Sequence, residues 1–216
     1  VGDDHSCAIT EVLRGSNQTY CWGTDTMGQL GNGGNDQPRP ASASAVNPER
    51  ISNDLLGFST LKASGSGTCA ITTSGADLYC WGGNRNGQLG LPVSASSTAP
   101  SRVDIGIGMD VIAFDLGIGG HGCAAEQRDA GGLVCWGSNS NQQLGHQAGG
   151  DWQATTAVEG ISGTLQIGTG EGHSCVLQAD HRVRCFGAND RGQLGIGAVG
   201  ADFGANRDAV VGIGGP

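Results

Sequence analysis

Residues 173–195 read HSCVLQADHRVRCFGANDRGQLG, and this stretch indicates which fold the chain adopts. Two short apolar segments, around Cys175 and Cys185, flank the polar residues 178–182. Short apolar segments on either side of a polar turn are typical of a β-hairpin whose strands are buried on both faces. Counted inward from the two cysteines, the strands meet symmetrically at Asp180. The two thiols are therefore expected to lie opposite each other, within disulfide reach.

The same pattern occurs four times along the chain. Each copy has a first cysteine, then a second cysteine followed by an aromatic residue and glycine, then a turn of the form Gly-Gln-Leu-Gly, which begins with glutamine in the third copy. The first cysteines of successive copies are separated by 62, 54 and 52 residues. Self-similarity at such a period is the signature of a repeat architecture. We therefore assign a single repeat domain with units at residues 1–45, 46–101, 102–157 and 158–216.

A further strand is expected before each hairpin. In the third copy apolar residues alternate at Ile112, Phe114, Leu116 and Ile118, and weaker counterparts occur at residues 165–167 and 58–62. Alternation of this kind predicts a strand. Each unit is therefore expected to be an antiparallel sheet of three to four strands, in an all-β chain.

The segments between these strands are rich in Ser, Ala and Pro. We interpret residues 41–48 and 92–100 as surface loops, because such residues punctuate regular structure. The longest connector also contains a plausible short helix at residues 48–56.

All eight cysteines fall in these hairpins. The symmetry predicts one disulfide per unit, joining Cys7 to Cys21, Cys69 to Cys80, Cys123 to Cys135 and Cys175 to Cys185. Closing a loop of this size stabilises the folded chain by about 3 kcal/mol per bridge in the chain-entropy model. Disulfides at this density indicate an oxidising compartment, such as the outside of the cell.

A zinc site is the alternative use of these thiols, with the nearby His5, His121 and His173. Ten to fourteen residues separate the two thiols of each copy, unlike the tight Cys-x-x-Cys knuckle, and the second copy has Gly67 in the histidine position. We therefore expect no metal and no cofactor.

Composition excludes several classes of partner. The formal net charge is −9, Lys62 is the only lysine, and no run of Lys or Arg could neutralise a phosphate backbone. No apolar stretch approaches the roughly 18 residues that cross a bilayer. Nucleic acid binding and membrane insertion are therefore not expected.

The succession Gly-x-x-His-Ser-Cys-Ala-Ile-Thr, Tyr-Cys-Trp-Gly and Gly-Gln-Leu-Gly resembles the repeat of the regulator-of-chromosome-condensation family over nearly the whole chain. The resemblance implies a β-propeller-like array of four blades, with the Gly-Gln-Leu-Gly turns packing between blades. The cysteine pair replaces two family positions that are usually not cysteine, a variant that looks like secreted members.

The resemblance implies several functions. Family members act as nucleotide-exchange factors for a small nuclear GTPase, as chromatin-bound scaffolds, as a secreted inhibitor of β-lactamases and as general interaction platforms. A shared fold does not choose among them. Exchange on an intracellular GTPase fits poorly with disulfides, and chromatin binding fits poorly with the negative charge.

Repetition argues that the polar residues of the motif are structural. A hydrolase triad would combine His173 and Ser174 with Asp180 or Glu171, but the His-Ser pair also recurs in the first copy. The turn glutamines are expected to satisfy neighbouring backbone groups; these are Gln29, Gln88, Gln143 and Gln193. The aromatic residues of the motif are expected in the core between blades; these are Trp22, Trp81, Trp136 and Phe186.

Two surface features have weaker signals. Asn17-Gln18-Thr19 is a glycosylation sequon at an expected hairpin tip, so Asn17 is a possible glycosylation site. The acidic pair Asp3-Asp4 lacks the Asp-x-Asp-x-Asp-Gly loop of a calcium site and is expected to be a solvated surface.

The two ends of the chain look like complementary parts of one unit. Residues 2–5 align with residues 170–173, so the first copy lacks a preceding strand. The sequence at residues 209–213 parallels that at residues 157–161. We predict that Ala209, Val210, Val211, Gly212 and Ile213 supply the missing strand of the blade containing Cys7, in their own chain or in a neighbouring one, because an unpaired sheet edge is normally covered.

These observations predict a non-enzymatic extracellular structural or protein-interaction module. Its expected partner is protein, including copies of itself, joined head to tail in a ring or filament through the chain ends. The alternative is a soluble secreted propeller that binds or inhibits another protein through its loops.

Overall fold

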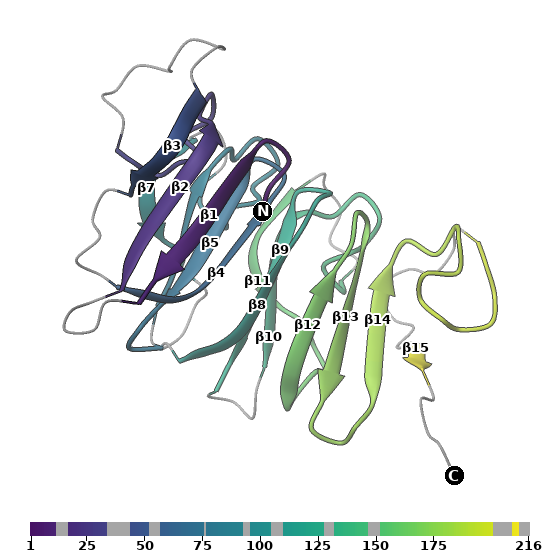
Figure 1. Ribbon diagram of the computed structural model, residues 1–216. Coiled ribbons are helices and arrows are strands. Elements are labelled where there is room, and N and C mark those ends of the chain that lie inside the picture. Colours follow the sequence, from purple (N-terminus) through teal and green to yellow (C-terminus); the bar gives the residue numbers. More distant parts are fainter. Residues whose placement is uncertain are drawn as a thin grey trace. The chain divides into compact units, whose positions relative to one another are not determined.

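The computed structural model describes residues 1–11, 17–33, 44–51, 57–75, 77–92, 96–104, 110–127, 132–146, 152–200 and 209–211. All regular elements in these residues are β-strands (Figure 1), so the described part contains no helix that could cross a membrane. The chain divides into two compact units, Val1–Asp104 and Ile105–Pro216. The predicted all-β class is confirmed, and each unit contains two antiparallel sheets.

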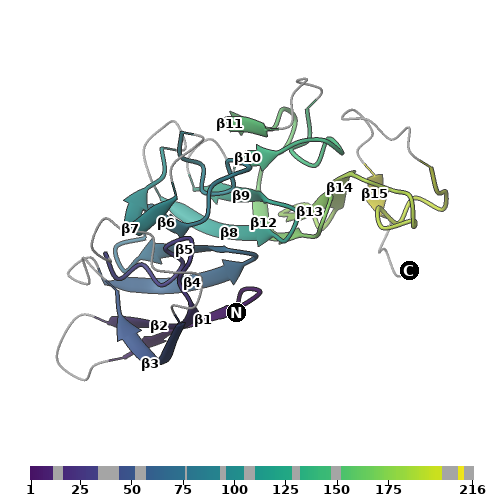
Figure 2. The ribbon, with the colours of Figure 1, turned by 90° about the horizontal axis from the view of Figure 1, so that it is seen from above.

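The first unit contains a three-stranded and a four-stranded sheet, which Figure 2 shows side by side. In the first sheet the order is β1 (His5–Thr10), β2 (Gln18–Thr24) and β3 (Ser44–Arg50). In the second it is β4 (Phe58–Ser64), β5 (Gly67–Thr72), β6 (Leu78–Gly82) and β7 (Ser97–Arg102). The strand β3 crosses the repeat boundary that the sequence places after residue 45.

The second unit contains two four-stranded sheets. One is ordered β8 (Val111–Gly117), β9 (His121–Glu126), β10 (Leu133–Ser138) and β11 (Trp152–Ala157). The other is ordered β12 (Thr164–Thr169), β13 (His173–Gln178), β14 (Val183–Gly187) and β15 (Ala209–Val211). Each of the four sheets is one blade, and we number the blades one to four along the chain.

One hairpin with one disulfide forms the centre of every blade. The two cysteines of each pair are register partners across the hairpin, and their Cα atoms are 4.1 Å apart in all four blades. The predicted disulfide in each sheet is therefore present. Together the four bonds use all eight cysteines of the chain.

The outer strands differ from the sequence-based expectation of loops. Both β3 and β7 overlap segments interpreted as loops, residues 41–48 and 92–100, and each pairs with the second strand of a hairpin. An outer strand needs only one hydrogen-bonded edge, so it tolerates Pro48 and Pro100 and shows no apolar alternation. The expected helix at residues 48–56 is also wrong at its start, because residues 48–50 belong to β3; residues 52–56 lie outside the described residues.

The structure corrects the expected role of the last segment within the chain. Ala209, Val210 and Val211 form β15, which pairs with β14 at the outer edge of blade four, and Gly212 and Ile213 lie outside the described residues. The sequence parallel with Ala157 misled the prediction, because Ala157 ends β11, which is itself an outer strand. These residues therefore do not complete the blade that contains Cys7 in the same chain.

Each unit has its own apolar core where its two blades meet. In the first unit the core contains Cys21, Leu30, Ile51, Phe58, Ala70 and Trp81. In the second it contains Cys123, Leu133, Cys135, Leu144, Val158, Ile161, Val176 and Phe186. Three of the four aromatic positions of the motif, Trp81, Trp136 and Phe186, are buried, whereas Trp22 is partly exposed.

Candidate functional site

The Gly-Gln-Leu-Gly turns have the same hydrogen bonds in all four blades. The side-chain Oε1 of each glutamine accepts a bond from the backbone N–H two residues earlier, at N···O distances of 2.7, 2.8, 2.9 and 2.9 Å for Gln29, Gln88, Gln143 and Gln193. An amide that satisfies the backbone of its own turn stabilises the turn. These glutamines therefore have a structural role in every blade.

A second set of turn residues was missed from the sequence. The Oδ1 of Asp25, Asn84, Asn139 and Asn189 accepts a bond from the N–H of the turn leucine at 3.0 to 3.1 Å. All four are buried. Their constant position, two residues after the glycine that follows the motif's aromatic residue, is the sequence signal that would have found them.

In the first unit, blade one and blade two are joined by a buried polar contact. His5 Nε2 lies 2.7 Å from the hydroxyl of Thr68, which immediately precedes the first cysteine of the next blade. Next to it, Trp81 Nε1 donates to the carbonyl of Gln29 at 3.1 Å. Gly31 lies against the Trp81 indole so closely that a Cβ would clash with it. The Gly-Gln-Leu-Gly turn of blade one thus packs against Trp81 of blade two.

The second unit repeats this junction between blades three and four. His121 Nε2 lies 3.0 Å from the hydroxyl of Ser174, and that hydroxyl donates to the carbonyl of Gln143 at 2.9 Å. Because the single hydroxyl proton goes to the carbonyl, the imidazole donates from Nε2 and is neutral with Nδ1 unprotonated. Burial lowers the pKa of His121 to about 4, and it does the same for His5.

The structure does not assemble the triad considered from the sequence. Ser174 is fully buried, and its histidine neighbour is His121 of the preceding blade. Asp180 lies in the hairpin turn, where it accepts a hydrogen bond from the backbone N–H of Arg182 at 3.0 Å. A buried hydroxyl bound to a carbonyl has no room for a substrate, so the His-Ser contact holds blades together.

Two further sites considered from the sequence are the glycosylation site at Asn17 and a metal site. Asn17 Nδ2, the atom that a glycan would modify, donates to the carbonyl of Phe58 at 3.0 Å, which counts against glycosylation of the folded chain. Within the described residues, no group of three or more His, Cys, Asp or Glu side chains is arranged to hold a metal.

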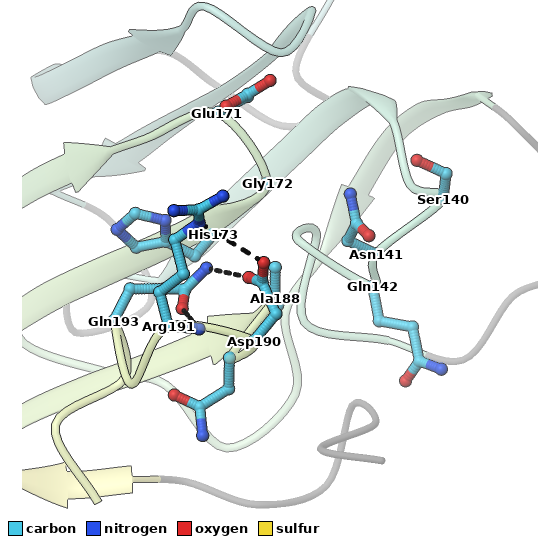
Figure 3. A pocket seen from close by; sticks show the side chains of 12 residues that line it. Ser140, Asn141, Gln142, Glu171, Gly172, His173, Ala188, Asp190, Arg191 and Gln193 are labelled. Atoms are coloured by element: carbon cyan, nitrogen blue, oxygen red, sulfur yellow. Dashed lines mark hydrogen bonds and ion pairs between the residues drawn. The ribbon is translucent and has the colours of Figure 1, made fainter. Parts of the chain in front are cut away.

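A polar cavity of about 790 Å³ opens in the second unit, beside the turns that follow β10 and β14. Figure 3 shows Ser140 and Asn141 of blade three on one side and Asp190, Arg191 and Gln193 of blade four on the other. Its remaining lining residues are Gln142, Glu171, Gly172, His173, Gly187, Ala188 and Asn189. Carboxylates, amides and a guanidinium suit a polar ligand that offers both donors and acceptors, such as a loop of another protein.

Gln142 stands out in the lining of this cavity. It has φ of 61°, whereas its counterparts in the other blades are glycines with φ of 82°, 69° and 77°. A non-glycine residue in this left-handed region is strained, and such strain is frequent at functional positions. Gln142 therefore marks this cavity, beside the turns that follow β10 and β14, as a candidate binding surface.

Comparison with known sequences decides the identity of the repeat. Models of the regulator of chromosome condensation (RCC1) repeat match residues 59–88, 76–124 and 165–193. These segments include the cysteine hairpin of blade two and that of blade four. The chain carries RCC1 repeats in these segments.

Several curated proteins resemble this RCC1-repeat chain. It is 27% identical to human E3 ubiquitin-protein ligase HERC2 over 93% of this chain and 4% of that protein. It is 30% identical to human probable ligase HERC3, over 86% and 17%, and 31% identical to the ultraviolet-B receptor UVR8 of Arabidopsis thaliana, over 91% and 42%. The chain thus spans less than half of each of these relatives.

Solved structures show the same fold at low identity. Yeast RCC1 (Prp20) bound to Kap60 superposes with a TM-score of 0.74 and 21% identity, over 95% of this chain and 46% of that one. Human WBSCR16 superposes at 0.70 and 20%, over 87% and 46%. The ectodomain of the Physcomitrella patens receptor kinase CR4 superposes at 0.53 and 19%, over 92% and 43%. The predicted propeller-type blades are thereby confirmed.

Proposed function

We propose that this RCC1-repeat protein is a non-enzymatic protein-interaction module that works outside the cell. The observation that carries the proposal is the pairing of all eight cysteines in four disulfides, one per blade. Reducing compartments keep thiols reduced, so a chain that depends on four such bonds fits an oxidising one. The likeness to a receptor-kinase ectodomain supports this location, because that relative carries the fold in an extracellular domain.

The interaction role is supported by the relatives and by the arrangement of polar groups. One similar structure contains yeast RCC1 bound to Kap60, and another is described by its binding to Gsp1p and histones. The hydroxyls that could serve as nucleophiles at the blade junctions, those of Thr68 and Ser174, are fully buried. The activities named for the larger relatives are not transferred, because the chain spans only part of each.

The location is tested by counting thiols. The protein is recovered from its natural source with an alkylating agent present from lysis onward, and non-reduced peptides are mapped by mass spectrometry. We expect four intra-blade linkages and no alkylated cysteine. A substantial fraction of alkylated thiols would contradict an oxidising location and leave the interaction role to be judged separately.

Two kinds of partner remain for such a module. The first is another copy of the chain, joined head to tail in a ring or filament. The second is a different protein that binds at the polar cavity of the second unit, which the strained Gln142 in its lining favours. The molar mass in solution distinguishes the two kinds of partner. It increases with protein concentration if the chain self-assembles, and it stays at the mass of one chain if the module binds only another protein.

A further inference from the structure

The polar cavity of the second unit contains a carboxylate that no other described residue uses. Glu171 lies in the short turn between β12 and β13, is exposed and lines the cavity. Its side chain forms no hydrogen bond or ion pair with another described residue. The other acidic residue of the lining, Asp190, is paired with Arg191, whose Nε lies 3.6 Å from Asp190 Oδ2. With histidine counted as neutral, Glu171 therefore leaves the lining with one uncompensated negative charge.

The charged residues on the blade-four side of the cavity already satisfy one another. Gln193 Nε2 donates to Asp190 Oδ1 at 2.8 Å, and Gln193 Oε1 accepts from the backbone N–H of Arg191 at 2.9 Å. The hydrogen bond from Gln193 also holds the pKa of Asp190 below its usual value, so this carboxylate stays ionised beside Arg191. Figure 3 shows these side chains linked among themselves and Glu171 apart from them.

Two uncharged polar side chains lie next to Glu171. Ser140 and Asn141 belong to the turn that follows β10, and both are exposed and line the cavity. Gly172, the residue after Glu171, lies so close to the Asn141 side chain that a Cβ would clash with its Nδ2. Neither the Ser140 nor the Asn141 side chain forms a hydrogen bond with another described residue. A carboxylate, an amide and a hydroxyl thus offer unused oxygen acceptors in one part of the cavity.

An exposed aliphatic residue adjoins this group. The β8–β9 turn of blade three packs against the β12–β13 turn, because Gly119 lies so close to the carbonyl oxygen of Glu171 that a Cβ would clash with it. Ile118 precedes Gly119 and is 66% exposed. Counted from the glycine on which each histidine packs, the β8–β9 turn is one residue longer than the β12–β13 turn. The longer turn thus adds apolar surface next to the free carboxylate.

The exposure of this part of the cavity does not depend on whether a further blade follows. Asp3 has the same place in blade one that Glu171 has in blade four, three residues after which Cys7 or Cys175 lies one position further on. Blade two packs against that turn, and the backbone N–H of Asp3 donates to the carbonyl of Gly65 at 3.0 Å. Asp3 is nevertheless exposed. A carboxylate at this position therefore stays accessible when a neighbouring blade is in place.

Resting on the proposed interaction role, we propose that this cavity binds an arginine side chain of a partner protein. The guanidinium donates two parallel hydrogen bonds to the Glu171 carboxylate, and its remaining N–H groups donate to Asn141 Oδ1 and the Ser140 hydroxyl. The aliphatic stem of the arginine packs on Ile118.

Arginine fits these groups better than the alternatives do. Its planar fork carries five donors, whereas the ammonium of lysine is a compact charge with three. An anionic side chain is disfavoured, because Arg191 is already paired and the chain has a formal net charge of −9. The occupant is therefore defined by its charge, by its number of donors and by its apolar stem, and each of these can be tested separately.

The test follows amide chemical shifts by NMR while N-acetyl-arginine N-methylamide is added to the isotope-labelled full chain with all disulfides formed. Matched probes replace arginine by citrulline, which has the same shape without the charge, by lysine or by glutamate. We expect millimolar binding of the arginine probe, with shifts at Ser140, Asn141 and Glu171. The citrulline probe should bind about five- to tenfold more weakly, the lysine probe should lie between them, and the glutamate probe should not bind. Added salt should weaken binding of the arginine probe and leave that of citrulline unchanged.

Two variants separate the charge from the apolar contact. Glu171→Gln keeps the size of the side chain and should reduce the affinity for the arginine probe to that for citrulline. Ile118→Ser should weaken binding of both probes by the same factor, about threefold, because it removes apolar contact and no charge. Glu159→Gln is the matched control: it makes the same charge change at an exposed residue outside the cavity lining and should bind like the wild type.

Several results would overturn the proposal, once thermal unfolding has established that each variant is folded. They are equal binding of the arginine and citrulline probes, unchanged affinity of Glu171→Gln, equal or tighter binding of the lysine or glutamate probe, and no shift at the cavity with tens of millimolar arginine probe. None of these results bears on the disulfides or on binding through other loops. The proposed extracellular interaction role is therefore judged independently, by the mapping of thiols.

Discussion

In three of the four blades, the glycine that follows the aromatic residue of the motif is required by a close backbone approach. Gly82 has φ of 104°, and a Cβ there would clash with the carbonyl oxygen of Ser66. Gly23 and Gly187 meet the carbonyls of Asp4 and Gly172 in the same way. The glycine therefore allows the second strand of the hairpin to pass over the turn that precedes the first strand.

We predict that Gly82→Ala destabilises the protein by more than about 2 kcal/mol, because backbone strain and a steric clash add together. Gly75→Ala is the matched control: Gly75 also has a positive φ, of 74°, but no atom lies within 4 Å of the place that a Cβ would occupy. Its cost should be about 1 kcal/mol. Urea unfolding of both variants measures the difference, and equal losses would refute the role of the Ser66 carbonyl.

The junction histidines make stability depend on pH. Burial lowers the pKa of His5 and His121 to about 4. As the pH falls below about 6.5, these histidines begin to bind protons in the unfolded chain but stay neutral in the folded chain. Their contribution is fully present above about pH 6.5 and is lost as the pH falls toward 4. The loss approaches a value on the order of 3 kcal/mol for each histidine when protonation is complete.

The double variant His5→Gln and His121→Gln isolates this effect, because the carboxylates titrate in both proteins. Its free energy of unfolding should change less than that of the wild type between pH 6.5 and 4. Chemical unfolding at a series of pH values makes the comparison. Parallel pH profiles would show that the two histidines are not the cause.

At the level of elements, the cysteine hairpin is the unit that the sequence predicts best. Its two strands are close in sequence, its turn is short, and the paired cysteines fix the register. The outer strands are the opposite case. The strands β3, β7 and β15 are polar, short or interrupted by proline, and they become strands because a hairpin edge offers them backbone hydrogen bonds.

We predict that replacing both Cys69 and Cys80 by alanine destabilises the first unit by about 2–5 kcal/mol. The bond closes the hairpin of blade two and is fully buried, so its loss both frees the unfolded chain and leaves a cavity. Denaturant unfolding of the variant beside the wild type under non-reducing conditions measures the change. An unchanged midpoint would mean that the core alone holds the hairpin.

For the whole molecule, the presence of a separate core in each unit predicts that the units can fold alone. A fragment of residues 105–216 retains the second core, two disulfides and the His121–Ser174 contact. It should unfold cooperatively and keep slowly exchanging amides in β9 and β13. Circular dichroism and hydrogen exchange of the fragment test this. Rapid exchange throughout both hairpins would show that the second unit depends on the first.

The amino-acid sequence was enough to establish the repeat, the hairpins, the disulfide pairs and the structural role of the turn glutamines, because all of these depend on residues within one copy. Which histidine meets which hydroxyl emerged only from the folded chain, since His5 and Thr68 are 63 residues apart. The folded chain also places Ala209–Val211 at the outer edge of blade four and leaves Trp22 partly exposed while Trp81 is buried. Similar motifs acquire different environments because burial depends on the neighbouring blade, which no single repeat specifies.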